Sequence, residues 1–262
     1  MNFLGRTGAR VTKRAGAWRH VAAVLWGVLV AAVQRRYWPR TTRNVFARQL
    51  LFIGVEATQV VALVAIMVGA TVVVQFQYWF VKFGQMHLLG PVLVTVVVRE
   101  LGPLLVNFIV IGRSGTAMAT EIGNMRIHGD VRVLDTQGLD PFTYLVLPRV
   151  AGTAVSVLCL TILFITVSFI SGYISGVLFG VLAGHQEQFV PSLFKAVGRT
   201  DIFNVLIKTL LPGAVTGVIC CSEGLSVSAA VTEVPQAATR AVVRSVAALC
   251  AISAAVSVMT YL

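Results

Sequence analysis

The sequence predicts an all-α integral membrane protein, with an N-terminal interfacial helix followed by five transmembrane helices. Composition and hydropathy together predict this class. The 262 residues are 57% hydrophobic and only 12% charged, whereas charged residues make up about 25% of an average soluble domain. The mean hydropathy is +0.85, and a water-soluble globule of this size cannot bury that much apolar surface. A soluble enzyme, a disordered chain and a disulfide scaffold are therefore excluded.

The first element is an interfacial helix expected at residues 16–38. Its apolar run at 21–33 follows a basic segment, as in a signal peptide. However, Arg35 and Arg36 follow the run directly without a small-residue cleavage site, and the run is too short to span a bilayer. We therefore expect a helix in the headgroup region that ends at Pro39. Its expected aromatic anchors are Trp18, Trp26, Tyr37 and Trp38.

Five apolar runs long enough to cross a bilayer follow this helix. They cover about 54–80, 91–122, 149–182, 202–221 and 241–261. No change of composition marks a second soluble domain. We therefore divide the chain into a basic segment at 1–48 and one membrane domain at 49–262.

Three polar stretches connect the later spans. Residues 121–148 predict a short water-exposed helix and a turn. Residues 183–200 predict a short helix that starts at Pro191, because proline favours the first turn of a helix. Residues 223–240 predict a polar loop.

The net charge of +11 is concentrated at the N-terminus. Ten of the 21 Lys and Arg residues precede Glu56, the first acidic residue, and the other 11 are nearly balanced by 10 acidic residues. By the positive-inside rule this excess holds the N-terminus and the 121–148 stretch in the cytoplasm, with the C-terminus outside. Lys195, Arg199 and Lys208 are a modest contrary signal in the second external loop. The charge therefore indicates membrane orientation and contact with lipid headgroups, and we expect no nucleic-acid partner.

Arg99 and Glu100 are the candidate functional charges, because they lie inside the second span. A charge there costs about 2.5–3.5 kcal/mol and usually faces a bundle interior or a cavity. Adjacent helical residues point about 100° apart, so we expect each to have a different partner or to meet water. Structural pairing and a role in a polar path or gate both remain open.

The first span also holds candidates for a lipid cavity. Val73, Val74, Gln75 and Tyr78 form an apolar stretch with one amide, beside Phe76 and Trp79. They line a lipid-binding pocket or face the bilayer, and the sequence does not separate these alternatives.

Small residues recur every fourth position along the third span. Ser168 begins this stripe, which continues through Gly172, Gly176, Gly180 and Gly184. Such spacing places small residues on one helix face and allows a second helix to approach closely. We expect helix packing here, with a flexible point in a transport cycle as the alternative.

No catalytic or metal-binding motif is present. The four residues 112–115 read GRSG, which is similar to the nucleophile motif of rhomboid-type proteases, but all four histidines lie in tails or loops. A serine without a nearby base is a poor nucleophile. The chain also has no G-x-x-x-x-G-K-[ST] phosphate loop, so we expect no enzymatic activity, no metal and no cofactor in this chain.

Residues 99–149 carry several motifs in a fixed order. They read RELGP at 99–103, GR at 112–113, EIG at 121–123, Met125, G-x-D-P at 138–141 and LVLPR at 145–149. This stretch strongly resembles the MlaE/YrbE permease family, the membrane subunit of MCE-type ABC lipid transporters. The resemblance continues more weakly over most of residues 48–262.

The resemblance implies a fold, partners and a substrate. The implied fold is the MlaE-type ABC permease fold, with an interfacial helix and five membrane helices. The chain would work as a homodimer with ABC ATPase subunits, which bind the ATP and magnesium, and with a hexameric MCE-domain protein. A STAS-domain subunit often accompanies the ATPase. The implied substrate is phospholipid, exchanged between the bacterial inner membrane and the periplasmic MCE ring.

The resemblance also implies roles for residues. The first span and the Arg99–Glu100 region would border the lipid cavity or gate. The loop at about 121–141 would contain the coupling helix that contacts the ATPase. The candidate coupling residues are Glu121, Met125, Arg126, Asp130, Arg132, Asp135, Gly138, Asp140 and Pro141.

The chain departs from the family pattern at residues 128–134. A common glutamate becomes Gly129 and a common aspartate becomes Arg132. Glycine costs about 1 kcal/mol inside a helix, so we expect a contact with the ATPase that is specific to this chain's partner.

Two other functions compete with the lipid permease. An ATP-independent secondary transporter or channel would bind a coupling ion at Arg99 and Glu100. A purely structural membrane anchor would tolerate joint replacement of these charges.

Overall fold

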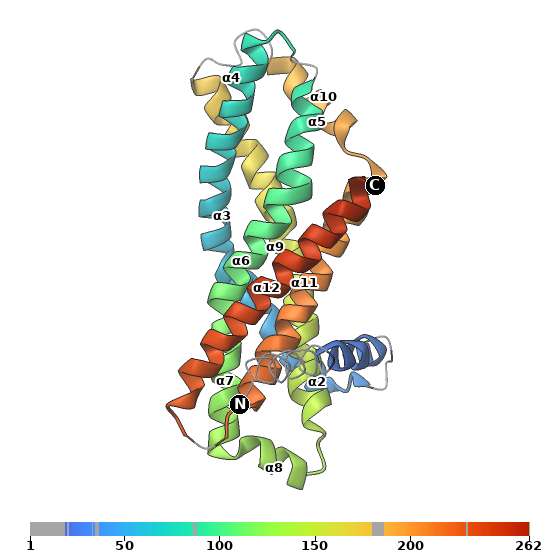
Figure 1. The fold of residues 1–262 in the computed structure, drawn as a ribbon, viewed down its shortest axis with the longest axis vertical. Coiled ribbons are helices and arrows are strands. Elements are labelled where there is room, and N and C mark those ends of the chain that lie inside the picture. The colour runs from blue at the N-terminus through green and yellow to red at the C-terminus, as the bar shows by residue number, and fades with distance from the viewer. Residues whose placement is uncertain are drawn as a thin grey trace, which may run out of the picture.

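The computed structural model describes residues 19, 21–32, 34, 37–85, 88–179, 186–228 and 230–261, with side chains for all of these except 186–190 and 261. Five helices in these ranges are long and apolar enough to cross a membrane. They run along the long axis of one elongated bundle (Figure 1), and the described ranges contain no strand. The predicted all-α membrane fold is confirmed.

The first two spans are continuous helices interrupted by π-helical turns, labelled η. The first contains α2 (Arg40–Leu50), η2 (Leu51–Val55), α3 (Glu56–Val68), η3 (Gly69–Val73) and α4 (Val74–Lys82). The second contains α5 (Leu89–Leu93), η5 (Val94–Leu101), α6 (Gly102–Val110), η6 (Ile111–Gly115) and α7 (Thr116–His128).

The remaining elements complete the bundle. They are α8 (Asp130–Thr136), η7 (Phe142–Val146), α9 (Leu147–Leu178), α10 (Gln186–Ala196), α11 (Arg199–Leu225) and α12 (Glu233–Tyr261). In Figure 1, α4, α5 and α10 lie at one end of the bundle and α8 lies at the other. We refer to these as the α10 end and the α8 end.

Several predicted boundaries were wrong. The second span continues through α7 to His128, the third begins at Phe142, and the fourth begins at Arg199. Pro191 lies inside α10 rather than at its start, and α12 begins at Glu233, inside the predicted loop. Hydropathy marks only the apolar part of each span, whereas the backbone hydrogen bonds of the helix continue into polar turns.

The N-terminal helix covers Val21–Ala32 and runs across the long axis of the bundle (Figure 1). It buries Val28 and Ala31 against the spans, while Trp26 is 71% exposed and Leu29 is 50% exposed. Both faces are therefore apolar. Residues 16–18, 20, 33, 35 and 36 of the predicted 16–38 helix, including the anchor Trp18, lie outside the described residues. Its position in the headgroup region stays a prediction.

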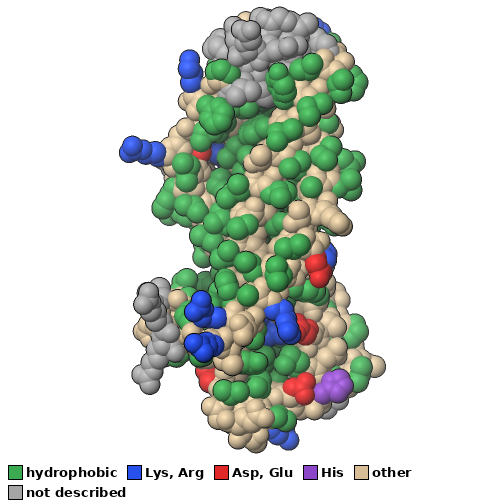
Figure 2. Space-filling view, turned by 180° about the vertical axis from the view of Figure 1, so that it is seen from behind, with side chains coloured by type: hydrophobic (Ala, Val, Ile, Leu, Met, Phe, Trp, Pro, Cys, Tyr) green, Lys and Arg blue, Asp and Glu red, His purple; other side chains and the backbone are tan. Residues whose placement is uncertain are grey.

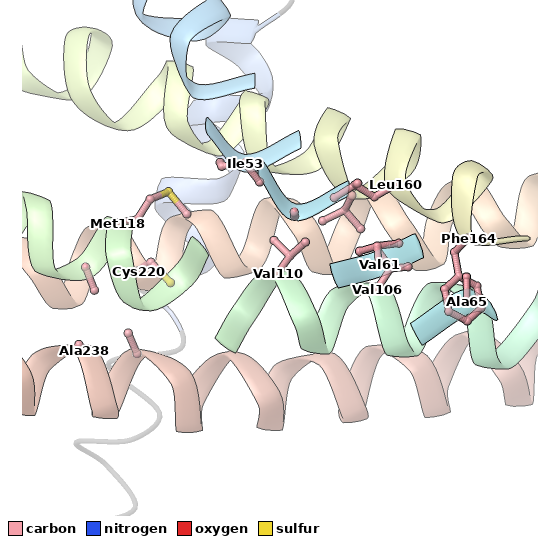
Figure 3. Close-up of a cluster of buried hydrophobic side chains, with 14 residues drawn as sticks. Ile53, Val61, Ala65, Val106, Val110, Met118, Leu160, Phe164, Cys220 and Ala238 are labelled. Atoms are coloured by element: carbon pink, nitrogen blue, oxygen red, sulfur yellow. The ribbon is translucent and has the colours of Figure 1, made fainter. Parts of the chain in front are cut away.

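The central core joins all five spans. Figure 3 shows Val61 of the first span and Val106 of the second beside Phe164 of α9, with Cys220 of α11 and Ala238 of α12 in the same cluster. Hydrophobic side chains also cover much of the surface in Figure 2, while charged side chains gather toward the α8 end.

The small-residue stripe on α9 packs against the first span, as predicted. Ser168 Oγ donates to the Ala65 carbonyl at 3.1 Å, and a Cβ on Gly172 would lie 2.5 Å from Val73 Cβ. Gly176 is also buried, whereas Gly180 and Gly184 lie outside the described residues. Gly69 of η3 provides the complementary small surface.

Gly69→Ala should destabilise this contact. The added Cβ would lie 2.2 Å from the Ser168 carbonyl oxygen, which is backbone and must shift, at a cost of about 1–3 kcal/mol. Gly112→Ala is the matched control, because a Cβ there meets nothing within 4 Å. Thermal unfolding in detergent should show a lower Tm for Gly69→Ala alone. Equal melting of the two variants would refute the close approach.

Candidate functional site

A cluster of two buried and two half-buried charges joins the second span to α11 and α12. Arg99 and Glu100 lie in η5, a π-helical segment. Asp201 and Lys208 come from α11, and each is only 1% exposed. We call these four residues, with Ser257 of α12, the buried charge cluster.

Each charge in the cluster has a partner of opposite sign. Arg99 Nε donates to Asp201 Oδ1. Lys208 Nζ donates to Glu100 Oε1 at 2.7 Å, to Ser257 Oγ at 2.7 Å and to the Arg99 carbonyl at 3.1 Å. Arg99 and Glu100 therefore pair with different residues, which confirms the prediction from their angular separation. Counting Lys208 among the charges of the second external loop was wrong, because this residue is buried within α11.

Asp201 also shapes the start of α11. Its second carboxylate oxygen accepts the Gly198 backbone N–H at 2.7 Å, so one side chain both caps the helix and binds Arg99. Satisfying a free N–H in the first turn stabilises a helix end. The α11 start is thereby fixed relative to η5.

A second set of ion pairs lies closer to the α8 end. Glu223 of α11 is buried. It accepts one hydrogen bond from Arg240 Nε at 3.2 Å and another from Arg244 Nη1, and both arginines belong to α12. Arg113 Nη2 donates to Glu56 Oε2 at 2.8 Å and joins the first two spans. The sequence reasoning did not find these pairs.

The first span does not present its four candidate cavity residues on one surface. Val73 is fully buried against α9, so its predicted place in a cavity is wrong. Val74 is half-buried, whereas Gln75 and Tyr78 are exposed. Gln77, which the prediction omitted, is fully buried and has no hydrogen-bond partner among the described residues. Because this run is apolar almost throughout, its hydrophobicity has no helical period that would distinguish the buried face of the helix from the exposed face.

The predicted coupling segment forms the α8 end of the molecule. Most of its candidate residues are exposed, including Arg126, Asp130, Arg132 and Asp135, while Met125 and Pro141 are half-buried. Gly129 has φ +85° between α7 and α8, so it occupies a left-handed turn that favours glycine. The expected helix-interior cost at Gly129 was therefore wrong. Within the described ranges, no group of three His, Cys, Asp or Glu side chains is placed to hold a metal.

Comparison with known proteins identifies the fold. Residues 46–259 match the family model described as Permease MlaE. The chain belongs to the MlaE permease family.

Curated relatives of this permease agree. A probable ABC transporter permease of Rickettsia prowazekii is 33% identical over 77% of each chain. A probable ABC transporter permease of Synechocystis is 31% identical over 80% of this chain and 79% of its own. The chloroplastic protein Trigalactosyldiacylglycerol 1 of Arabidopsis thaliana is 31% identical over 76% of this chain and 56% of its own. The chain is therefore a multi-pass permease subunit of an ABC transporter, a class that works with an ATPase partner.

The motif residues of this MlaE permease contact one another. Arg149 of LVLPR is buried, and its Nη2 donates to Glu121 Oε1 of EIG at 2.8 Å. Glu121 thus ties α7 to α9, in addition to any contact with another protein.

The G-x-D-P motif ends one helix and begins the next. Gly138 has φ +73°, and Leu139 N–H donates to the Leu134 carbonyl at 3.0 Å, which is the Schellman ending of α8. Asp140 accepts the Phe142 N–H at 3.1 Å and the Thr143 N–H at 3.3 Å, so it caps the next helix. Pro141 occupies the first helical turn, where a missing N–H costs nothing.

Proposed function

We propose that the chain forms a homodimer that moves phospholipid between the bacterial inner membrane and a hexameric MCE-domain protein in the periplasm. Two ABC ATPase subunits bind at the α8 end, where they hold ATP and magnesium, and a STAS-domain subunit accompanies them. The N-terminus lies in the cytoplasm and the C-terminus in the periplasm. This permease carries out no covalent chemistry.

The lipid substrate is supported chiefly by one relative. The Arabidopsis relative is named after a galactolipid, and the surface of this chain suits an apolar cargo. In the single chain, only 28% of the most apolar 18-residue stretch of the first span is buried. The corresponding share for the last span is 22%. These faces favour contact with acyl chains or with a second copy of the chain.

The orientation is supported by the distribution of charge. Lys and Arg side chains gather at the α8 end on the face shown in Figure 2, and the positive-inside rule places such an end in the cytoplasm. The exposed charges of α8 then meet the ATPase, and movement there reaches the spans through the Glu121–Arg149 pair.

The secondary-transporter alternative agrees less well with the molecule. Its coupling ion would need the charges of Arg99 and Glu100, which Asp201 and Lys208 already neutralise. Membership in an ABC permease family also requires no coupling ion.

Affinity purification of the detergent-solubilised protein tests the proposal. We expect an ATPase and an MCE-domain protein to co-purify, and reconstitution of that complex to move labelled phospholipid only with ATP. Transport by the purified chain alone under an ion gradient would contradict it. Purification with neither partner, together with no transport under an ion gradient, would leave only the anchor function.

Charge reversal on α8 should weaken ATPase binding. Arg132 and Asp135 are exposed, and neither side chain makes a hydrogen bond or ion pair within the described structure. Arg132→Glu and Asp135→Lys should therefore lower ATPase retention several-fold without changing Tm. The loss should vary with salt because rim charges are screened.

Lys195→Glu is the matched control for these reversals, because Lys195 is exposed at the α10 end. Asp140 and Glu121 are less suitable positions, since a reversal there also breaks a helix cap or an ion pair. If both α8 reversals retain the ATPase as well as Lys195→Glu does, α8 is not the coupling surface.

A further inference from the structure

An apolar groove lies beneath the N-terminal helix, close to the α8 end. It is a half-open space of about 550 Å³. Val21 and Val24 of the N-terminal helix form one wall, and Phe142 of η7 and Val218 of α11 form the others. Ser222, Glu223 and Arg244 lie at its polar edge. We call it the α8-end groove.

The polar edge of the groove lies beside an excess positive charge, formed by Arg244 at the edge and by Arg240, which binds the same carboxylate. Arg240 and Arg244 share the single carboxylate of Glu223, so the three residues have a net charge of +1. The arginine side chains are 46% and 50% exposed, whereas that of Glu223 is 6% exposed. The exposed guanidinium groups retain donors, because each has five N–H groups. An anion at this edge would find both charge and donors.

The surroundings of the groove are apolar. The outward face of the same N-terminal helix presents Trp26, Leu29 and Val30, which are 71%, 50% and 42% exposed. A helix that is apolar on both faces is stable when it is buried in protein or in lipid rather than in water. In a chain with five apolar spans, lipid surrounds the mouth of the groove, and an apolar cavity with one cationic edge matches an anionic amphiphile.

We propose that the α8-end groove binds one anionic phospholipid from the adjacent leaflet. An acyl chain lies between Val24 and Val218, and the phosphate lies against Arg244 and Arg240. The lipid fills the space under the N-terminal helix and holds that helix against η7, α11 and α12. The site does not depend on which substrate the transporter moves, and its lipid is a resident ligand.

Photocrosslinking of the full chain tests this site. The probe is phosphatidylglycerol with a diazirine on one acyl chain, in phosphatidylcholine vesicles containing the reconstituted protein. The comparison probe is phosphatidylcholine with the same diazirine chain. We expect phosphatidylglycerol crosslinks to concentrate on peptides that contain residues 21–24 and 218–226, above the level of the comparison probe. Crosslinks spread evenly over Trp26, Leu29 and Val30, or equal yields from the two probes, would overturn the proposal.

Two valines of the N-terminal helix provide a matched pair of variants. Val24→Trp fills the groove, while Val30→Trp adds the same volume to the outward face. We expect Val24→Trp to reduce groove crosslinks to the background of an unirradiated sample, and Val30→Trp to leave them unchanged. If Val24→Trp does not fold, Ser222→Leu narrows the groove from α11 instead. Unchanged crosslinks in a folded filled variant would overturn the proposal.

Arg244→Gln tests the headgroup contact. Arg240 then neutralises Glu223 alone and the excess charge disappears, so the preference for phosphatidylglycerol should fall about fivefold. Arg132→Gln, an exposed arginine of α8, should keep the preference. An unchanged preference in Arg244→Gln would contradict the headgroup assignment. Failure of phospholipid transport in the assay above would leave these crosslinks unaffected, so the two proposals fail separately.

Discussion

Glu100→Ala should destabilise the protein more than Lys208→Met, although the two residues form one ion pair. The side chain of Lys208 is 1% exposed and that of Glu100 is 36% exposed. Removal of Glu100 leaves a buried ammonium without its counter-charge, and such a loss costs about 3–5 kcal/mol. Removal of Lys208 leaves a carboxylate that reaches the surface of the chain and still accepts Ser257 Oγ at 3.0 Å. Its cost should therefore be smaller.

The double variant Glu100→Ala/Lys208→Met should recover most of the loss. It leaves neither charge unpaired, and replacing both members of a buried pair with apolar groups is often neutral. A double-mutant cycle on thermal unfolding in detergent gives the coupling free energy. Additive effects of the single substitutions would show that the contact carries no coupling.

The same double variant separates structural pairing from a gate. If the pair only joins η5 to α11, lipid transport by the reconstituted complex should return with stability. If the charges also act in a polar path, the double variant should melt normally and transport poorly. The sequence left these alternatives open, and this comparison decides between them.

The sequence was sufficient to predict the spans, but not the partners within them. Five apolar runs identify five helices because hydropathy depends only on local composition. Asp201 and Lys208 lie about 100 residues from Arg99 and Glu100 along the chain, and only the packing of α11 on η5 brings them together. Lys208 was counted with the charges of the second external loop, although it falls within the predicted apolar run at 202–221, because the sequence does not show the buried carboxylate that pairs with it.

The α8 end shows a different limit of prediction from the sequence. The G-x-D-P motif was recognised from its family, but its backbone function was not predicted. Gly138 and Asp140 are typical helix-ending and helix-capping residues, so local capping rules could have found it. The burial of Val73 and Gln77, in contrast, depends on the face that α9 covers, and the first span has no polar stripe to indicate that face.

Loss of both arginines that bind Glu223 should have the other large effect. Glu223 is a buried carboxylate held by two half-exposed cations from α12. Either arginine alone supplies a counter-charge, so Arg240→Gln and Arg244→Gln should each cost about 1 kcal/mol or less, as for an exposed ion pair. The double variant Arg240→Gln/Arg244→Gln leaves the carboxylate without a cation, and we expect a cost of about 3–5 kcal/mol.

Non-additive stability losses would distinguish one shared carboxylate from two independent ion pairs. Thermal unfolding of the two single variants and the double variant in detergent should show a double-variant loss well above the sum of the single losses. Adding Glu223→Gln to the double variant should restore much of the stability, because no charge then remains buried. Arg43→Gln/Arg48→Gln, which removes two exposed arginines from α2, is the control for the loss of two positive charges. A double-variant loss equal to the sum of the singles would mean that the arginines act independently, and that Glu223 does not join α11 to α12 through a shared carboxylate.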